Sequence, residues 1–132
     1  INDIYVETPD KVWMVGSRGT ILVGNGRDGF RSVGFAGDTE TLLSITRFKD
    51  QYVVASDYAL HLFDGHHLTP FKPRLRGRAR PTPLKVQAID DVLYYFDYKR
   101  GIHRYDGERW TEIVIPAALR ARAFKGLAPR SP

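Results

Sequence analysis

Hydrophobic residues gather in short runs along this chain, polar turns separate the runs, and the arrangement recurs. The clearest stretch is 52–71, YVVASDYALHLFDGHHLTPF, which alternates apolar runs with a polar turn and an Asp-Gly turn. The dipeptides Asn25-Gly26, Asp64-Gly65 and Asp106-Gly107 fall at the same point of three copies, 39 and 42 residues apart. Such dipeptides between apolar runs are hairpin signals. A period of about 40 residues is typical of a four-stranded propeller blade.

The apolar runs predict twelve short strands, four in each copy. They are expected at 3–8, 12–16, 20–24 and 30–33, then at 42–48, 51–55, 59–63 and 68–71, and finally at 84–89, 92–96, 101–105 and 110–115. The runs YVVA and LYYF carry little alternation, which is typical of central strands that are buried on both faces. We therefore expect an all-β protein.

The near-constant period favours a β-propeller over a sandwich, because a sandwich has no reason to repeat in this way. The predicted blades cover about 1–33, 41–71 and 84–115, within a propeller segment 1–116 that a basic tail, 117–132, follows. Propellers have about four to eight blades, so three blades leave two open flanks. The chain is expected to pair with itself into a six-bladed ring, to complete a ring with a second polypeptide, or to be part of a longer chain. A non-propeller arrangement is the remaining alternative.

The first copy, WMVGSRGTILVGNGRDGF at 13–30, resembles the blade repeat of photosystem-II assembly-factor propellers and of BNR-type propellers. The FDG and YDG corners at 63–65 and 105–107 resemble those of kelch and WD-repeat propellers. The second and third copies lack the V-G and G-T-I-L residues of the first. The resemblance implies a propeller fold, and propellers host unrelated activities.

Charge is unevenly distributed over the 132 residues, whose net charge is +5. The segments 72–85 and 117–132 together carry ten Lys or Arg and no acid, so the remaining chain has a net charge of −5. Attraction to nucleic acid is expected from those two segments alone. The chain has no cysteine, which excludes disulfides and thiolate metal sites. It also shows no signal-peptide pattern and no apolar run of about 18 residues, so we expect a cytoplasmic protein with no membrane partner.

No motif of a known catalytic centre or cofactor site occurs, and we expect a non-enzymatic protein without cofactor or metal. His61 and His103 occupy equivalent positions and are interpreted as strand residues. Asp57 and Asp97 are interpreted as turn residues that bond their own backbone, and Asp-Gly turns explain Asp64 and Asp106. Aromatic residues on the predicted strands are interpreted as packing between blades rather than as a platform for sugars or bases.

The turns between second and third strands emerge on the same face of a propeller as the connections between blades. This face is the predicted binding surface, because Tyr and Arg are enriched in protein interfaces. Its predicted partner-binding residues are Arg18, Asp57, Tyr58, Arg74, Arg76, Arg78, Arg80, Tyr98, Lys99 and Arg100.

The predicted function is that of a protein-binding module. Degenerate small propellers also resemble proteins encoded beside secreted bacterial toxins, and this resemblance implies an immunity-type inhibitor of a toxin. A nucleic-acid-binding module that uses the strip from Arg74 to Arg80 is an alternative. A glycan-binding or hydrolytic propeller is a further one.

Overall fold

The computed structural model describes residues 1–34, 40–75 and 80–114, and these fold into three four-stranded antiparallel sheets. Blade 1 comprises β1 (Asp3–Thr8), β2 (Lys11–Val15), β3 (Ile21–Asn25) and β4 (Gly29–Ser32). Blade 2 comprises β5 (Leu42–Phe48), β6 (Gln51–Ser56), β7 (Leu60–Phe63) and β8 (Leu68–Pro70). Blade 3 comprises β9 (Pro83–Ile89), β10 (Val92–Asp97), β11 (Gly101–Tyr105) and β12 (Trp110–Ile113). Each strand pairs with its neighbours in the sequence, so every blade is a simple meander.

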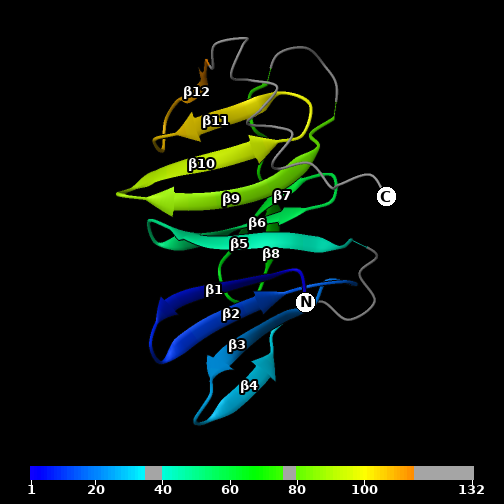
Figure 1. Cartoon of the computed structure of the whole chain (residues 1–132), viewed down its shortest axis with the longest axis vertical. Coiled ribbons are helices and arrows are strands. Elements are labelled where there is room, and N and C mark those ends of the chain that lie inside the picture. The colour runs from blue at the N-terminus through cyan, green and yellow to red at the C-terminus, as the bar shows by residue number, and fades with distance from the viewer. Residues whose placement is uncertain (35–39, 76–79, 115–132) are drawn as a thin grey trace.

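The three blades lie side by side with their first strands next to one another (Figure 1). Contacts between blades are made mainly by β1, β5 and β9, which are therefore the inner strands. Side chains of blade 2 join these strands: Ser44 Oγ accepts a hydrogen bond from Val86 N at 3.2 Å, and Thr46 Oγ1 accepts one from Ala88 N at 3.0 Å. On the other side, Ser44 Oγ donates to Asp3 Oδ2 at 3.0 Å. The all-β fold and the partial propeller of three four-stranded blades are confirmed.

Apolar side chains fill the space between neighbouring blades in two separate cores. Trp13 of blade 1 packs against Tyr52 and Phe63 of blade 2, with ring centroids 4.6 and 6.0 Å away. The second core joins blades 2 and 3 and includes Leu60 and Tyr95, both nearly fully buried. These aromatic residues lie inside the cores, as predicted for packing between blades.

Strand ends lie within one residue of the predicted ones, except that β12 ends at Ile113. Residue 115 and the predicted basic tail, 117–132, lie outside the described residues. Pro70 lies on the outer strand β8, where the loss of a donor costs little.

The expectation that the runs YVVA and LYYF are buried on both faces holds for YVVA in the second copy and is wrong for LYYF in the third. Residues Tyr52 to Ser56 of β6 are all buried, because blades lie on both faces of blade 2. In β10, by contrast, Leu93 and Tyr95 are buried whereas Tyr94 and Phe96 are only half-buried. The reason is that a neighbouring blade covers one face of blade 3 and none follows it among the described residues.

The turn between the third and fourth strands begins with the same side-chain cap in all three blades, which explains the recurring Asn or Asp. In blade 1, Asn25 Oδ1 accepts hydrogen bonds from Arg27 N and Asp28 N. Asp64 Oδ1 accepts hydrogen bonds from the backbone N–H groups of His66 and His67, and Asp106 Oδ1 does so from the two equivalent groups. Gly65 and Gly107 have φ of +102° and +107°, as predicted for Asp-Gly turns. Blade 1 differs: its left-handed glycine is Gly29, because the turn after Asn25 is longer.

Candidate protein-binding face

The turns between second and third strands and the connections between blades meet on one face of the molecule. Three backbone hydrogen bonds hold them together: Gly19 N to Glu40 O at 2.9 Å, Asp57 N to Thr41 O at 3.0 Å, and Tyr98 N to Thr82 O at 2.8 Å. We call the turns 17–20, 56–59 and 98–100, with the connecting segments 40–41 and 71–82 where described, the loop face. This arrangement is the one that the propeller geometry predicts.

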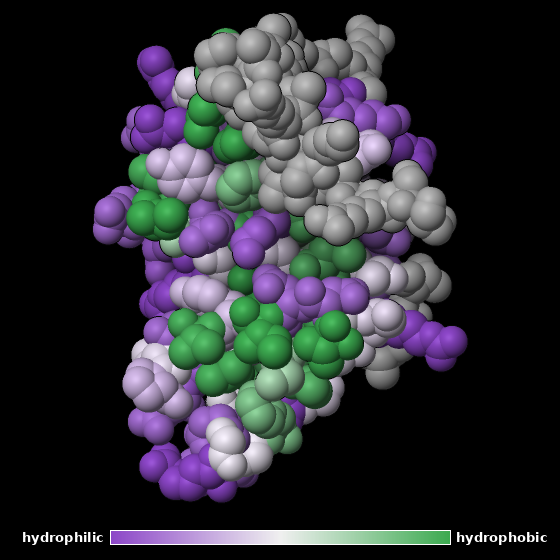
Figure 2. Space-filling model, in the orientation of Figure 1, coloured by the Kyte–Doolittle hydropathy of each residue, from purple (hydrophilic) through white to green (hydrophobic). Residues whose placement is uncertain are grey.

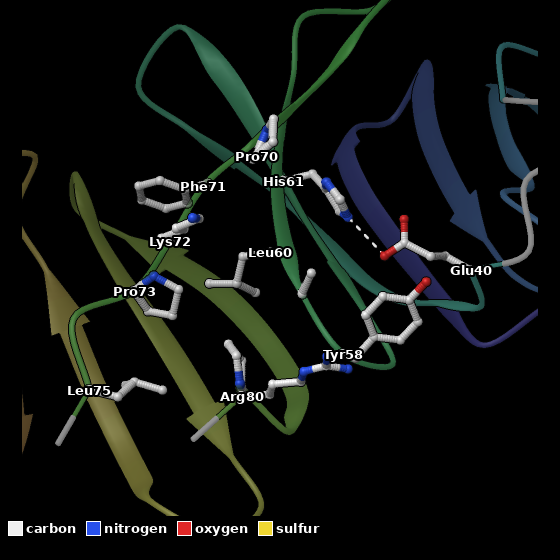
Figure 3. Close-up of a pocket in the computed structure, with 12 residues that line it drawn as sticks. Glu40, Tyr58, Leu60, His61, Pro70, Phe71, Lys72, Pro73, Leu75 and Arg80 are labelled. Carbon is white, nitrogen blue, oxygen red and sulfur yellow. Dashed lines mark hydrogen bonds and ion pairs between the residues drawn. The ribbon is translucent and has the colours of Figure 1, made fainter. Parts of the chain in front are cut away.

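A pocket of about 650 Å³ opens on the loop face between blade 2 and the segment that leads to blade 3 (Figure 3). Its apolar lining comes from the start of β7, the end of β8 and the connection beyond it. The lining residues are Glu40, Tyr58, Ala59, Leu60, His61, Pro70, Phe71, Lys72, Pro73, Leu75, Arg80 and Pro81. A recess of this size with few polar groups is typical of a binding site.

The charged groups of the pocket are not equivalent. Glu40 Oε1 lies 3.2 Å from His61 Nε2 and accepts a hydrogen bond from Ser56 Oγ at 2.8 Å, so this carboxylate already has partners in the chain. Lys72 and Arg80, in contrast, are exposed. Tyr58 is 49% exposed, and its ring stands at the edge of the pocket beside Arg80 (Figure 3). The pocket therefore combines an apolar lining with a cationic and aromatic rim.

Asp97 holds the blade 3 part of the loop face together. Its fully buried carboxylate accepts hydrogen bonds from Tyr95 Oη at 2.5 Å and from Thr82 N and Oγ1 at 3.0 and 2.7 Å. It also accepts bonds from Lys99 N at 3.0 Å and Arg100 N at 2.9 Å. Burial by itself would raise the pKa of Asp97, but these hydrogen bonds outweigh it and lower the pKa below the ordinary value. Burial, and then the bond to Asp97, raises the pKa of Tyr95.

The predicted turn role is thus observed at Asp97 but is wrong for Asp57. Asp57 is exposed, and the neighbouring Ser56 takes the role in blade 2, since its Oγ accepts hydrogen bonds from Tyr58 N at 3.4 Å and Ala59 N at 3.1 Å. Aspartate and serine both cap a turn in this way, and the register of the strand decides which of two adjacent residues points inward.

The structure brings only some of the predicted binding residues together. Tyr58 and Arg80 line the pocket, and Arg74 is exposed on the same connection. The remaining described ones lie in the turns of the three blades outside the pocket: Arg18, Asp57, Tyr98, Lys99 and Arg100. Arg76 and Arg78 lie outside the described residues.

Two of the turn residues are placed very differently. Tyr98 is 52% exposed on the loop face. The side chain of Arg100 is only 16% exposed, donates to Arg80 O at 3.3 Å and lies 4.0 Å from Asp97 Oδ1. Arg100 therefore helps to hold the loop face, whereas Tyr98 is presented on it.

Several pocket residues were missed by sequence reasoning. Leu60 and Phe71 have the pattern of ordinary strand residues, and Leu75 lies in a segment whose most prominent sequence feature is its arginines. The one usable signal was His61, which the repeat places at a position where a strand residue faces the preceding blade. The sequence does not show that Glu40, in the preceding connection, reaches it.

Glu7 forms a second polar centre, between blades 1 and 2, that sequence reasoning also missed. Its carboxylate accepts hydrogen bonds from Trp13 Nε1 at 2.9 Å, Tyr52 Oη at 2.7 Å and Arg47 Nη1 at 2.8 Å. Burial alone would raise the pKa of Glu7, but the bonds from Tyr52, Trp13 and Arg47 lower it overall. This centre joins the two blades through the side chains of Trp13, Tyr52 and Arg47.

His61 and His103 lie on strands β7 and β11, as predicted. His103 Nε2 lies 3.1 Å from Arg100 O, and His67 Nδ1 lies 3.6 Å from Asp64 in an exposed turn. Over 1–34, 40–75 and 80–114, no group of three or more His, Asp or Glu side chains is placed to hold a metal ion. The same residues include no helix long and apolar enough to cross a membrane.

Comparison with known proteins adds information on the fold alone. No family model and no curated protein sequence matches the chain. Among solved structures, it is similar to YCF48 bound to a D1 peptide, with a TM-score of 0.63 and 13% sequence identity over 83% of this chain. The match spans 37% of the YCF48 chain. The chain therefore has a propeller-like repeat fold and spans little more than a third of the propeller that it resembles.

Proposed function

We propose that the chain is a non-enzymatic protein-binding module whose loop face receives an extended segment of a partner protein. The observation that carries this proposal is the pocket of about 650 Å³ between blade 2 and the connection to blade 3. It is apolar inside, through Leu60, Phe71 and Leu75, and cationic at its rim, through Lys72 and Arg80.

The chemistry of the pocket defines the partner segment. An apolar side chain would fill the recess, and a neighbouring carboxylate would meet Lys72 or Arg80. The exposed ring of Tyr58 offers a rigid contact surface, and a tyrosine of this kind is often a dominant residue in a protein interface. Prolines at 70, 73 and 81 keep the lining stiff, so little conformational freedom is lost when the segment binds.

The comparison supports the class of ligand and nothing finer. The YCF48 structure contains a bound D1 peptide, so a protein with this type of fold binds a peptide. At 13% identity no contact can be transferred residue by residue.

The test is selection of ligands from a displayed library of random peptides. We expect enriched sequences with an acidic residue near a large apolar one. Their affinity should fall by at least about tenfold in Tyr58→Ala and in Arg80→Glu, since both change the pocket rim. Arg27→Ala, in the exposed turn after β3, is the matched control and should bind normally. The proposal fails if no peptide is enriched, or if enriched peptides bind both pocket variants as tightly as the wild type.

A narrower version makes the partner a secreted bacterial toxin and the chain its immunity-type inhibitor. It draws on the acidic charge of the chain outside 72–85 and 117–132, which suits a basic toxin. A partner isolated through the loop face should then be a toxin whose activity stoichiometric amounts of the chain suppress. A partner without toxic activity would refute this version and leave the broader one standing.

A nucleic-acid-binding module is the second candidate, because Lys72, Arg74 and Arg80 are all exposed on one connection. Binding to single-stranded RNA should then weaken steeply with salt, with a slope in log affinity against log salt of about 0.7 for each neutralised phosphate. A flat salt response, or unchanged binding in the double variant Arg74→Ala/Arg80→Ala, would exclude it.

A further inference from the structure

The face of blade 1 that points away from blade 2 is covered with apolar side chains. Alternation along the strands places Trp13, Val15 and Val23 in the core with blade 2, so their neighbours face the other way. Those neighbours form two rows across the sheet: Ile4, Met14 and Leu22, then Val6, Val12 and Phe30.

This free face of blade 1 is open to solvent in the described structure. Ile4, Val6 and Phe30 are 57%, 62% and 41% exposed. A space-filling view shows a cluster of hydrophobic residues over the region of blade 1 (Figure 2). Exposed apolar side chains gathered on one face of a protein mark an interaction surface.

The equivalent face is buried against the preceding blade in blades 2 and 3. This comparison indicates which partner suits the free face of blade 1. Leu22 corresponds to His61 and His103, which the strand register places on the face toward the preceding blade. The neighbours of His61 and His103 across the sheet, Val54 and Tyr95, are fully buried in the inter-blade cores. The free face of blade 1 therefore has the side-chain pattern that receives a preceding blade.

Blade 3 carries the complementary surface at the other end. Phe96, Ile102 and Ile113 form an apolar row on the face that points away from blade 2. The equivalent rows, Val15 with Ile21 in blade 1 and Ala55 with Leu60 in blade 2, pack against the blade that follows. The row on blade 3 therefore fits a following blade, which is what blade 1 of another chain would be.

We propose that two copies of this chain close a six-bladed ring, with blade 3 of each copy packed on blade 1 of the other. Six blades fall within the range in which propellers close. The two seams are related by a two-fold axis, so each copy buries both of its free faces at once. The ring does not involve the loop face, and it holds or fails independently of the proposed binding function.

Charge complementarity supports a second copy at this seam. At the inner strands, Asp3 of blade 1 bonds to Ser44 of blade 2, and Ser44 bonds to Val86 of blade 3. The strand register gives Lys85 of blade 3 the same place as Asp3 and Ser44. In the ring, the exposed Lys85 of one copy would therefore reach β1 of the other, near its Asp3.

The test is the mass in solution, measured by native mass spectrometry and light scattering. We expect twice the mass of the chain for the wild type. In Val6→Glu the dissociation constant should rise at least about 100-fold, because a charge is then buried without a partner at both seams. Val6 is exposed in the single chain, so this change should not impair folding. Tyr98→Glu, an equally drastic change on the loop face, is the control and should remain dimeric.

A mixing experiment distinguishes the ring from other dimers. Ile102→Glu alone should also be monomeric. An equimolar mixture of Val6→Glu and Ile102→Glu chains should recover a weak dimer, since one of its two seams then joins unaltered faces. A monomeric wild type, assembly only with a different polypeptide, or a dimer insensitive to Ile102→Glu would overturn the proposal. The last result would indicate that two blade 1 faces pair with each other.

Discussion

The hydrogen-bond network around Asp97 gives the sharpest test of how the loop face is held. In Asp97→Asn, the amide oxygen can replace Oδ1 and keep the bonds from Thr82 Oγ1, Lys99 N and Arg100 N. The amide nitrogen then replaces Oδ2, and it is a donor. Thr82 N therefore loses its acceptor. The fully buried Tyr95 hydroxyl no longer donates to a carboxylate and can only accept a weaker, neutral bond from the amide nitrogen.

The magnitude follows from the bonds lost and weakened. The two bonds to Oδ2 are charge-assisted, and such a bond contributes about 1.5–3 kcal/mol, whereas a neutral one contributes about 0.5–1.5 kcal/mol. Loss of the Thr82 bond and weakening of the Tyr95 bond should therefore lower the free energy of unfolding by about 2–5 kcal/mol. Tyr95→Phe removes one of them and should cost about 2 kcal/mol. Both substitutions affect the same bond between Tyr95 and Asp97. The double variant should therefore lose about 1–2 kcal/mol less stability than the sum of the two single losses.

The contribution also depends on pH, with a definite sign. Because the pKa of Asp97 is lowered in the folded chain, its stabilisation is fully present above the ordinary value of 3.8. It is lost as the pH falls below that value towards the folded pKa. The difference in unfolding free energy between wild type and Asp97→Asn should therefore be largest near neutral pH and shrink in acid.

The assay is urea unfolding followed by tryptophan fluorescence, since Trp110 packs beside Tyr95 with ring centroids 6.2 Å apart. Asp57→Asn is the matched control: the residue is exposed in the corresponding part of blade 2 and should change stability by less than about 0.5 kcal/mol. If Asp97→Asn costs no more than this control, or if the two losses at Asp97 and Tyr95 are additive, the network does not hold the turn as argued.

Two further predictions concern blade 1. Gly24→Ala should lower the free energy of unfolding by about 1–3 kcal/mol, because the added Cβ would lie 2.0 Å from Gly29 O. Gly26→Ala is the control: its added Cβ meets nothing within 4 Å, and it should be neutral in the same urea titration. Glu7→Gln should cost about 1–3 kcal/mol at neutral pH, since it weakens the bonds from Tyr52, Trp13 and Arg47. That cost should diminish as the pH falls below the ordinary carboxyl pKa of 4.5, because the pKa of Glu7 is lowered in the folded chain. Thermal unfolding at several pH values measures the cost. A cost that does not change with pH would show that the charge of Glu7 does not stabilise the fold.

Most of the fold could be predicted because it depends on residues close together in the sequence. Asp64 and Asp106 cap turns through backbone groups two and three residues away, and each hairpin needs only two adjacent apolar runs. The repeat of these local features, about 40 residues apart, was sufficient to indicate blades. The loop face followed from the order of strands within a blade.

The binding pocket and the polar centres depended on tertiary structure. Glu40, in the connection before blade 2, meets His61 of β7 across 21 residues, because the connection passes over that blade. Glu7 of blade 1 meets Tyr52 of blade 2 across 45 residues, because the two sheets pack together. Which of two adjacent turn residues points inward, Ser56 rather than Asp57, was set by the register of a strand against its partners. Local pattern determined the strands and turns of this protein. The packing of one sheet on the next decided which side chains meet, since those distances depend on the position of whole blades.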